Sequence, residues 1–303
     1  MHKNNKHQKD YDFKVLTQKV PELKEFVFAN KYGSITIDFA NPDAVKLLNK
    51  ALLKTYYTID YWEFPDAHLC PPIPGRLDYI HHLADLLNPY KLKNRATLID
   101  IGTGATCIYP LLGFKEYNWK FVATEIDTQV LKIAQTIIDK NKLSTAIELR
   151  LQSNKSHILK GIIKPTDAFV ASMCNPPFYK NEQEAIEATT RKLKGLKKEH
   201  TNPVRNFSGT ANELWYEGGE KAFLHNYLYE SSLFKTNCFW YTSLVSNKDL
   251  VKSMQKSLKK LEATHVKVIN MQQGNKVSRV VAWTFLTIEQ QKQWNSKNIQ
   301  IAL

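Results

Sequence analysis

Residues 97–106 read Thr-Leu-Ile-Asp-Ile-Gly-Thr-Gly-Ala-Thr, a short apolar run that ends in a glycine-rich loop. The run is typical of a buried strand, and glycines let the loop backbone approach a ligand at the strand's carboxyl end. A dinucleotide fingerprint would need a third glycine where Cys107 stands, and the Gly-Lys-Ser/Thr of a phosphate loop is missing. The stretch therefore predicts either a plain tight turn or a ligand loop that binds neither NAD nor ATP phosphates.

Further apolar runs follow the first one, and helical stretches such as 127–142 separate them. Asp127 precedes that helix and is expected to cap it. The predicted strands cover 97–102, 120–125, 147–152, 168–174 and 238–246. Strands that alternate with helices predict an α/β, Rossmann-like, mostly parallel sheet. The last two apolar runs, 265–271 and 280–288, flank a Gly-containing connection and predict an antiparallel pair at the sheet's edge.

The residues before this sheet have a different pattern. Residues 1–10 are polar and basic, which predicts a flexible arm that is either a solvated terminus or an RNA contact. Residues 11–94 predict a helical region that frames the substrate, with helices over 21–28, 43–57 and 76–87 and a non-helical proline-rich turn over 70–76. Residues 95–303 then form the sheet domain.

Composition limits the classes of function. The 303 residues contain 42 Lys and Arg against 29 Asp and Glu, a formal charge of +13 that favours a polyanionic partner. The four cysteines are far apart in sequence, so neither a disulfide framework nor a metal site is expected. No apolar run is long enough to span a membrane, and we expect a cytoplasmic, monomeric protein.

The second strand ends in Glu125, twenty-one residues after Gly104. An acidic side chain at this place can accept hydrogen bonds from both ribose hydroxyls of an adenosine group. Because no phosphate cradle accompanies it, the predicted cofactor is a nucleoside that bears a positive group. S-adenosyl-L-methionine fits that description.

The tetrapeptide Asn175-Pro176-Pro177-Phe178 directly follows the fourth strand. Each proline removes an N–H donor and leaves its carbonyl able to accept from a substrate. If Asn175 Oδ1 and the Pro176 carbonyl each accept one N–H of an adenine amine, the nitrogen lone pair turns toward a methyl sulfonium, and Phe178 can stack on an unstacked base. The plain alternative is an ordinary strand-exit turn.

Residues 179–209 form a long connection beside this motif and hold five basic residues in eight positions: Arg191, Lys192, Lys194, Lys197 and Lys198. The segment is interpreted either as an RNA-phosphate clamp or lid, or as a solvated charge run. Lys276 and Arg279, near the turn of the last strand pair, are further candidates for contact with an RNA backbone.

These elements in this order resemble the class I methyltransferases that modify exocyclic amines. The resemblance to the bacterial 23S ribosomal RNA adenine N6-methyltransferases of the adenine-1618 type, and to the METTL-type U6 snRNA adenine methyltransferases, is closer and covers nearly the whole chain. It rests on YDF (11–13), SITIDFANPDAVKLLNKALL (34–53), LCPPIPGRLDYIHHLADLL (69–87), DIGTGATCIYPLLG (100–113), ATEID (123–127), CNPPF (174–178) and ELWYEGGEKAF (213–223).

The resemblance implies roles for matching residues. Arg76, Gly102, Gly104 and Thr106 would contact S-adenosyl-L-methionine, Glu125 its ribose, and Asn175 both cofactor and target amine; Lys155 would contact RNA, and Ser156 would lie near the adenine and cofactor.

The implied reaction is methylation of N6 of one adenine in 23S ribosomal RNA, free or in a large-subunit assembly intermediate. Three alternatives stay open: another structured RNA such as a U6-like hairpin, a protein glutamine amide, and a non-catalytic RNA-binding assembly factor.

Overall fold

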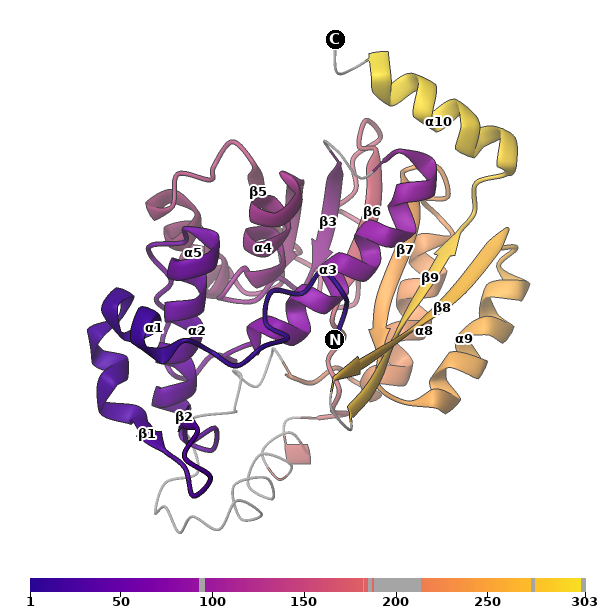
Figure 1. Cartoon of the computed structure of the whole chain (residues 1–303). Coiled ribbons are helices and arrows are strands. Elements are labelled where there is room, and N and C mark those ends of the chain that lie inside the picture. Colours follow the sequence, from indigo (N-terminus) through magenta and orange to yellow (C-terminus); the bar gives the residue numbers. More distant parts are fainter. Residues whose placement is uncertain (93–95, 182, 185–186, 188–213, 274–275, 301–303) are drawn as a thin grey trace.

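A seven-stranded sheet forms the centre of the described part of the molecule (Figure 1). The computed structural model describes residues 1–92, 96–181, 183–184, 187, 214–273 and 276–300. The strand order is β5-β4-β3-β6-β7-β9-β8. The strands are β3 (Thr97–Ile101), β4 (Lys120–Glu125), β5 (Ile147–Leu151), β6 (Phe169–Cys174), β7 (Cys238–Val245), β8 (His265–Gln273) and β9 (Lys276–Thr284). The predicted α/β fold is confirmed.

The pairing of the strands sets where the chain can bind a ligand. β3 lies between β4 and β6 and runs parallel to both, whereas β8 and β9 form the antiparallel pair predicted at the edge. The connections from β3 lead to β4 and β5 on one side, and β6 and β7 lie on the other. Ligands of such sheets bind where the order of the strands reverses, at the carboxyl ends. The loops after β3 and β6 meet at this point.

Successive residues of the strands face opposite sides of the sheet. In β3, Leu98 belongs to one apolar cluster and Ile99 to the other; in β4, Phe121 and Val122 divide in the same way. The first cluster includes residues of α2 (Pro42–Tyr57), α3 (Ile73–Leu87), α4 (Ile108–Tyr117) and α5 (Thr128–Lys140), and the second includes residues of α8 (Gly219–Ser231) and α9 (Lys248–Lys260). Helices thus cover both faces, as the near-continuous apolar strands require.

The remaining elements lie toward the ends of the chain. They are α1 (Phe13–Lys19), η1 (Pro21–Phe26), β1 (Val27–Ala29), β2 (Ile35–Ile37), η2 (Asn88–Tyr90) and α10 (Ile288–Gln300). Residues before and after position 94 share one apolar cluster, and the domain boundary there stays a prediction. No helix in the described residues is long and apolar enough to cross a membrane.

Two expectations for the helical region are wrong. The helix predicted over 21–28 ends as η1 at Phe26, and β1 and β2 then form an antiparallel hairpin. Asn30 Oδ1 accepts the backbone N–H of Tyr32 at 2.9 Å and that of Ser34 at 3.1 Å, and Gly33 has a φ of +79°. This side-chain turn, flanked by β-branched and aromatic residues, favours a hairpin over a helix.

The second correction concerns the proline-rich turn at 70–76. Its last four residues are the first turn of α3, which begins at Ile73. Proline is compatible with a first helical turn because the N–H it lacks would have no partner within the helix. Arg76 therefore projects from a helix and not from a loop.

The basic arm predicted at residues 1–10 is instead packed against α3. His2, Asn5 and His7 are buried. The His2 backbone N–H donates to Asp78 Oδ1 at 2.9 Å, and the Asn5 side-chain amide donates to the Pro74 carbonyl at 2.9 Å. The arm's composition indicated solvation, but its polar groups find partners in the fold.

Candidate active site

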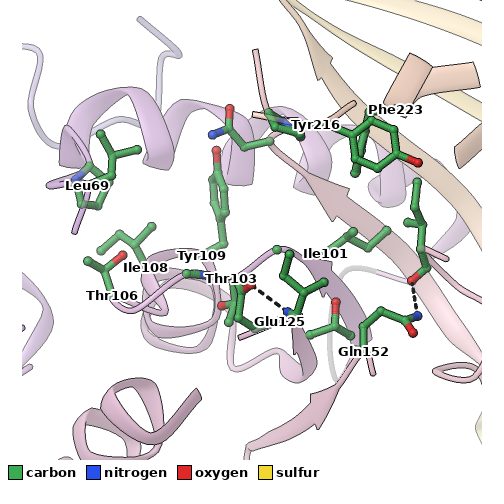
Figure 2. Close-up of a pocket in the computed structure, with 18 of the residues that line it drawn as sticks. Leu69, Ile101, Thr103, Thr106, Ile108, Tyr109, Glu125, Gln152, Tyr216 and Phe223 are labelled. Atoms are coloured by element: carbon green, nitrogen blue, oxygen red, sulfur yellow. Dashed lines mark hydrogen bonds between the residues drawn. The ribbon is translucent and has the colours of Figure 1, made fainter. Parts of the chain in front are cut away.

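A pocket opens at the carboxyl ends of the parallel strands, with about 1070 Å³ of space in and before its mouth, open solvent included. Figure 2 shows Leu69, Thr106 and Ile108 on one side, Tyr216 and Phe223 on the other, and Glu125 and Gln152 along its lower side. The predicted site residues that line it are Arg76, Gly102, Gly104, Thr106, Glu125, Lys155, Asn175 and Pro177. The fold thus brings the glycine loop, the acidic strand end and the Asn-Pro-Pro motif to one cavity.

The backbone conformation of the glycine loop leaves free space beside it. Gly102 has a φ of +70°, a conformation that favours glycine, and a Cβ built there would meet no heavy atom within 4 Å. The Thr103 N–H donates to the Thr124 carbonyl at 2.9 Å, and the Gly104 N–H donates to Glu125 Oε2 at 3.1 Å. These bonds tie the loop to the end of β4 and leave room beside Gly102 for a ligand.

Arg76 enters the pocket from the first turn of α3. Its Nη1 donates to the Tyr109 hydroxyl at 2.8 Å, and its guanidinium carbon lies 5.3 Å from the centre of the Tyr109 ring. A guanidinium held by one nitrogen and by an aromatic face keeps its other N–H groups available for a carboxylate. Sequence reasoning missed Tyr109, the partner that orients Arg76.

Asp100 lies beneath the loop and is buried at 1 % exposure. Burial raises the pKa of its carboxyl to about 7, and the nearby Thr103 hydroxyl and Arg76 guanidinium oppose part of this rise. Arg76 Nε, Thr103 Oγ1 and both carboxyl oxygens of Asp100 are buried and make no hydrogen bond of normal geometry with any described residue. Of these groups Arg76 and Thr103 line the pocket, where their buried polar atoms can meet a polar ligand.

The donor set therefore fits S-adenosyl-L-methionine. The Arg76 guanidinium and the Thr103 hydroxyl line the pocket with the open backbone at Gly102, where an amino-acid group that carries both charges can be bound. Glu125 is 9 % exposed and lines the same pocket, and its predicted contact with a ribose stays a prediction.

The Asn-Pro-Pro motif continues from β6 into the wall of the pocket. The Cys174 N–H, just before it, donates to the Tyr79 hydroxyl at 3.4 Å. Asn175 and Pro177 line the pocket. Pro176 is buried, Phe178 is 41 % exposed, and neither lines it. The structure thus places Asn175 at the cavity and leaves the Phe178 ring available at the surface.

A loop after β5 supplies another part of the wall, through Gln152, Lys155, His157 and Ile158. Glu230 Oε2 accepts three backbone N–H groups from it, those of Ile158, Leu159 and Lys160, at 3.0, 2.6 and 2.9 Å. Lys155 was predicted here, but Gln152 was missed because a lone amide at a strand end gives no signal. Ser156 is exposed and does not line the pocket, so the geometry gives no support to its predicted cofactor contact.

Three other lining residues were also missed: Trp215, Tyr216 and Phe223. They lie about forty residues beyond the motif in sequence, and the block 213–223 was noted only for its family resemblance. Adjacent aromatics in a segment that returns to a motif would have been the available signal.

The proposed RNA contacts are only partly described. Arg191, Lys192, Lys194, Lys197 and Lys198 lie outside the described residues, as does the side chain of Lys276. Arg279 is half-buried on β9, opposite Val245 of β7 and Asn270 of β8. The predicted roles of these residues stay predictions.

Two curated sequence relatives that are nearly half identical to this chain carry the same name. The ribosomal RNA large subunit methyltransferase F of Flavobacterium johnsoniae is 49% identical over 303 aligned residues, covering 97% of this chain and 96% of the relative. The protein of the same name from Yersinia enterocolitica is 47% identical over 306 aligned residues, covering 98% of this chain and 91% of the relative.

Solved structures with the same fold are similar over almost the whole chain. The METTL16 catalytic domain in complex with MAT2A 3′UTR hairpin 1 aligns with a TM-score of 0.80 and 31% identity, covering 95% of this chain and 96% of that one. The N-terminal domain of human METTL16 in complex with SAH aligns with a TM-score of 0.75 and 28% identity, covering 95% and 99%. The fold is that of a class I methyltransferase. A family model described as RNA methyltransferase matches residues 1–287, and the chain belongs to this family.

Proposed function

We propose that this protein transfers a methyl group from S-adenosyl-L-methionine to N6 of one adenine in 23S ribosomal RNA, of the adenine-1618 type. One observation carries the proposal: a single pocket joins the glycine loop and Glu125 to Asn175 and Pro177. The names of the sequence relatives support a large-subunit ribosomal RNA substrate. The enzyme is proposed to act in the cytoplasm as a monomer.

The residues around the glycine loop would hold the cofactor. Arg76 offers a guanidinium to a carboxylate, Gly102 and Thr106 line the adjoining space, and Glu125 accepts from a ribose diol. The complex of human METTL16 with SAH, which we take as S-adenosylhomocysteine, supports a related ligand in this chain. S-adenosyl-L-methionine, when bound, supplies a methyl group on a positively charged sulfur.

The Asn-Pro-Pro motif would orient the target amine. An exocyclic amine of adenine is a poor nucleophile because its lone pair is conjugated with the ring. Acceptance of its two N–H bonds by Asn175 Oδ1 and the Pro176 carbonyl opposes this conjugation and directs the lone pair. As the N6–methyl bond forms, the sulfur–methyl bond would break to leave a neutral thioether, and N6 would then release one proton to solvent. Positioning and fixed dipoles supply the acceleration, and no strong base is required. Phe178, exposed directly after the prolines, is proposed to stack on the extruded base.

Basic residues would supply the sequence-independent part of RNA affinity. Lys155 lines the pocket and is proposed to contact a phosphate next to the target. From the sequence alone, the basic run 191–198 is proposed to bind further phosphates, and so are Lys276 and Arg279. Charge reversal at Lys194, Lys197 and Lys198 should then weaken RNA binding and reduce its dependence on salt. If charge reversal leaves the salt dependence of RNA binding unchanged, the basic run does not bind RNA phosphates, and the alternative of a solvated charge run holds.

The decisive experiment maps N6-methyladenosine in total RNA from cells with and without this protein. The proposal expects one 23S position to lose its methyl group, and the purified protein to restore it on RNA or particles from the deficient cells. Comparison of naked 23S RNA with large-subunit intermediates identifies the substrate form. Loss of a mark in another RNA, or of a glutamine methyl group in a protein, would contradict the proposed substrate.

A further inference from the structure

Residues 214–216 are hydrogen-bonded to the chain just after the Asn-Pro-Pro motif. The N–H groups of Phe178 and Tyr179 donate to the Leu214 carbonyl at 3.0 and 3.1 Å, and the Tyr216 N–H donates to the Tyr179 carbonyl at 3.0 Å. Tyr179 and Trp215 form an isolated parallel bridge. These bonds fix the position of Trp215 relative to the motif that ends two residues before Tyr179.

The two aromatic side chains of this segment line the pocket but differ in their hydrogen bonding. The Tyr216 hydroxyl accepts from the Asn226 side-chain amide at 3.2 Å, and its ring packs edge-on against Phe223 with 5.3 Å between ring centres. The indole Nε1 of Trp215 is buried and has no hydrogen-bond partner among the described residues. The fold thus uses the polar group of Tyr216 and leaves that of Trp215 for another molecule.

An unused buried N–H has a cost. Leaving such a donor without an acceptor destabilises a protein by roughly 1–3 kcal/mol, so persistent cases call for a ligand or a bound solvent molecule. The other buried polar atoms of this kind in residues that line the pocket belong to Arg76 and Thr103, on the side proposed for the cofactor. Trp215 comes from the segment bound to the motif, on the side proposed for the target base. Because an indole N–H can only donate, its partner must be an acceptor.

We propose that the Trp215 Nε1–H donates to N1 of the target adenine and thereby selects adenine over guanine. This inference rests on the proposed function and extends it to base recognition. N1 lies next to the amino group on the same edge of the base and is an acceptor in adenine, whereas guanine carries a hydrogen there. N7 accepts in both purines, so a donor to N7 would not distinguish them.

The test combines an atomic change in the RNA with one in the protein. A 23S fragment that the wild-type enzyme methylates is prepared with adenosine, 1-deazaadenosine or 7-deazaadenosine at the target. Wild type should lose about 10-fold or more in kcat/KM on the 1-deaza RNA, since one hydrogen bond to a buried donor is lost. Trp215→Phe should show a similar loss on adenosine and little further loss on the 1-deaza RNA.

The cycle of four rates removes the intrinsic effect of the 1-deaza change on amine reactivity, because that effect is common to both enzymes. Tyr216→Phe is the matched control: it removes a hydroxyl that already has a protein partner, and it should show no coupling to the 1-deaza change. Additive effects of Trp215→Phe and 1-deaza, or coupling to 7-deaza instead, would overturn the assignment.

Two further measurements distinguish a failure of the role assigned to Trp215 from a failure of the proposed function. Thermal unfolding and calorimetric affinity for S-adenosylhomocysteine should be unchanged within about twofold in Trp215→Phe, which locates the defect in base recognition. If wild type binds S-adenosylhomocysteine but methylates no adenine in ribosomal RNA, the proposed function fails. If it methylates adenine and the cycle shows no coupling, only the role of Trp215 fails.

Discussion

The carboxylate of Glu125 at the end of β4 accepts the backbone N–H of Gly104 at 3.1 Å, across twenty-one residues of sequence. Its other oxygen accepts the Ile126 N–H at 2.7 Å. A side chain oriented by two backbone groups is prepared for a ligand before the ligand arrives, which reduces the entropy lost on binding.

Glu125→Gln should weaken affinity for S-adenosylhomocysteine about 10-fold or more, since a neutral amide accepts hydrogen bonds from a ribose less strongly than a carboxylate. Isothermal titration calorimetry measures this directly. Glu22→Gln, an exposed substitution in η1, is the control and should bind as wild type does. Equal affinities of the two variants for S-adenosylhomocysteine would show that Glu125 does not bind the ribose.

Asn175→Ala should reduce kcat by about 100-fold or more, because the amide oxygen is expected to act on the reacting amine itself. Single-turnover methylation of a 23S fragment measures the loss, and filter binding should show RNA affinity within a few-fold of wild type. Asn181→Ala, an exposed asparagine six residues further along, should retain activity. A slow Asn181→Ala enzyme would point to general damage near the motif.

Asp100→Asn should change how stability depends on pH. Burial raises the pKa of this carboxyl from 3.8 to about 7 in the folded protein. As pH rises, Asp100 therefore loses its proton at a lower pH in the unfolded chain than in the folded protein. Between pH 4 and 7 the unfolding free energy of wild type should therefore fall, relative to the variant, by up to about 1.4 kcal/mol per pH unit. Urea unfolding without ligand across this range gives the difference, which should level off above pH 7. A constant difference would show that Asp100 is ionised in the fold.

Asn5→Ala should lower the unfolding free energy by about 1–3 kcal/mol. The Asn5 amide donates to Asp78 Oδ1 at 2.5 Å and to the Pro74 carbonyl at 2.9 Å, and its loss leaves Asp78, 1 % exposed, with one buried partner fewer. Chemical unfolding measures the effect, with the exposed Lys9→Ala as control. If both variants match wild type, the N-terminal segment contributes little to stability.

The sheet and the centre of the site were predictable for physical reasons. Strands that are buried on both faces must be apolar throughout, so 97–102 and 168–174 stood out from their neighbours. Parallel strands bring their carboxyl ends to one edge of a sheet, which is why Gly102, Glu125 and Asn175, each at or just after the end of a strand, line one pocket.

Contacts between distant segments were not predictable from local pattern. The bonds that bring Trp215 to the motif cross about thirty-five residues and depend on backbone groups, which carry no sequence signal. The basic N-terminal residues indicated a free arm because charge describes solubility and not the partners that a fold provides; Lys6 pairs with Glu116, for example. Phe178 was predicted to stack on a base; its ring is exposed and does not line the pocket, and the stacking stays a prediction.

The packing of the N-terminal segment also bears on the first turn of α3, which carries Arg76. His2 and Asn5 bond to Asp78 and Pro74, groups that lie within two residues of Arg76 and more than sixty residues from the chain's start in sequence. The support of this turn thus comes from a distant part of the chain as well as from its own helix. A substitution among the chain's first residues can therefore reach a side chain of the pocket through the backbone that carries it.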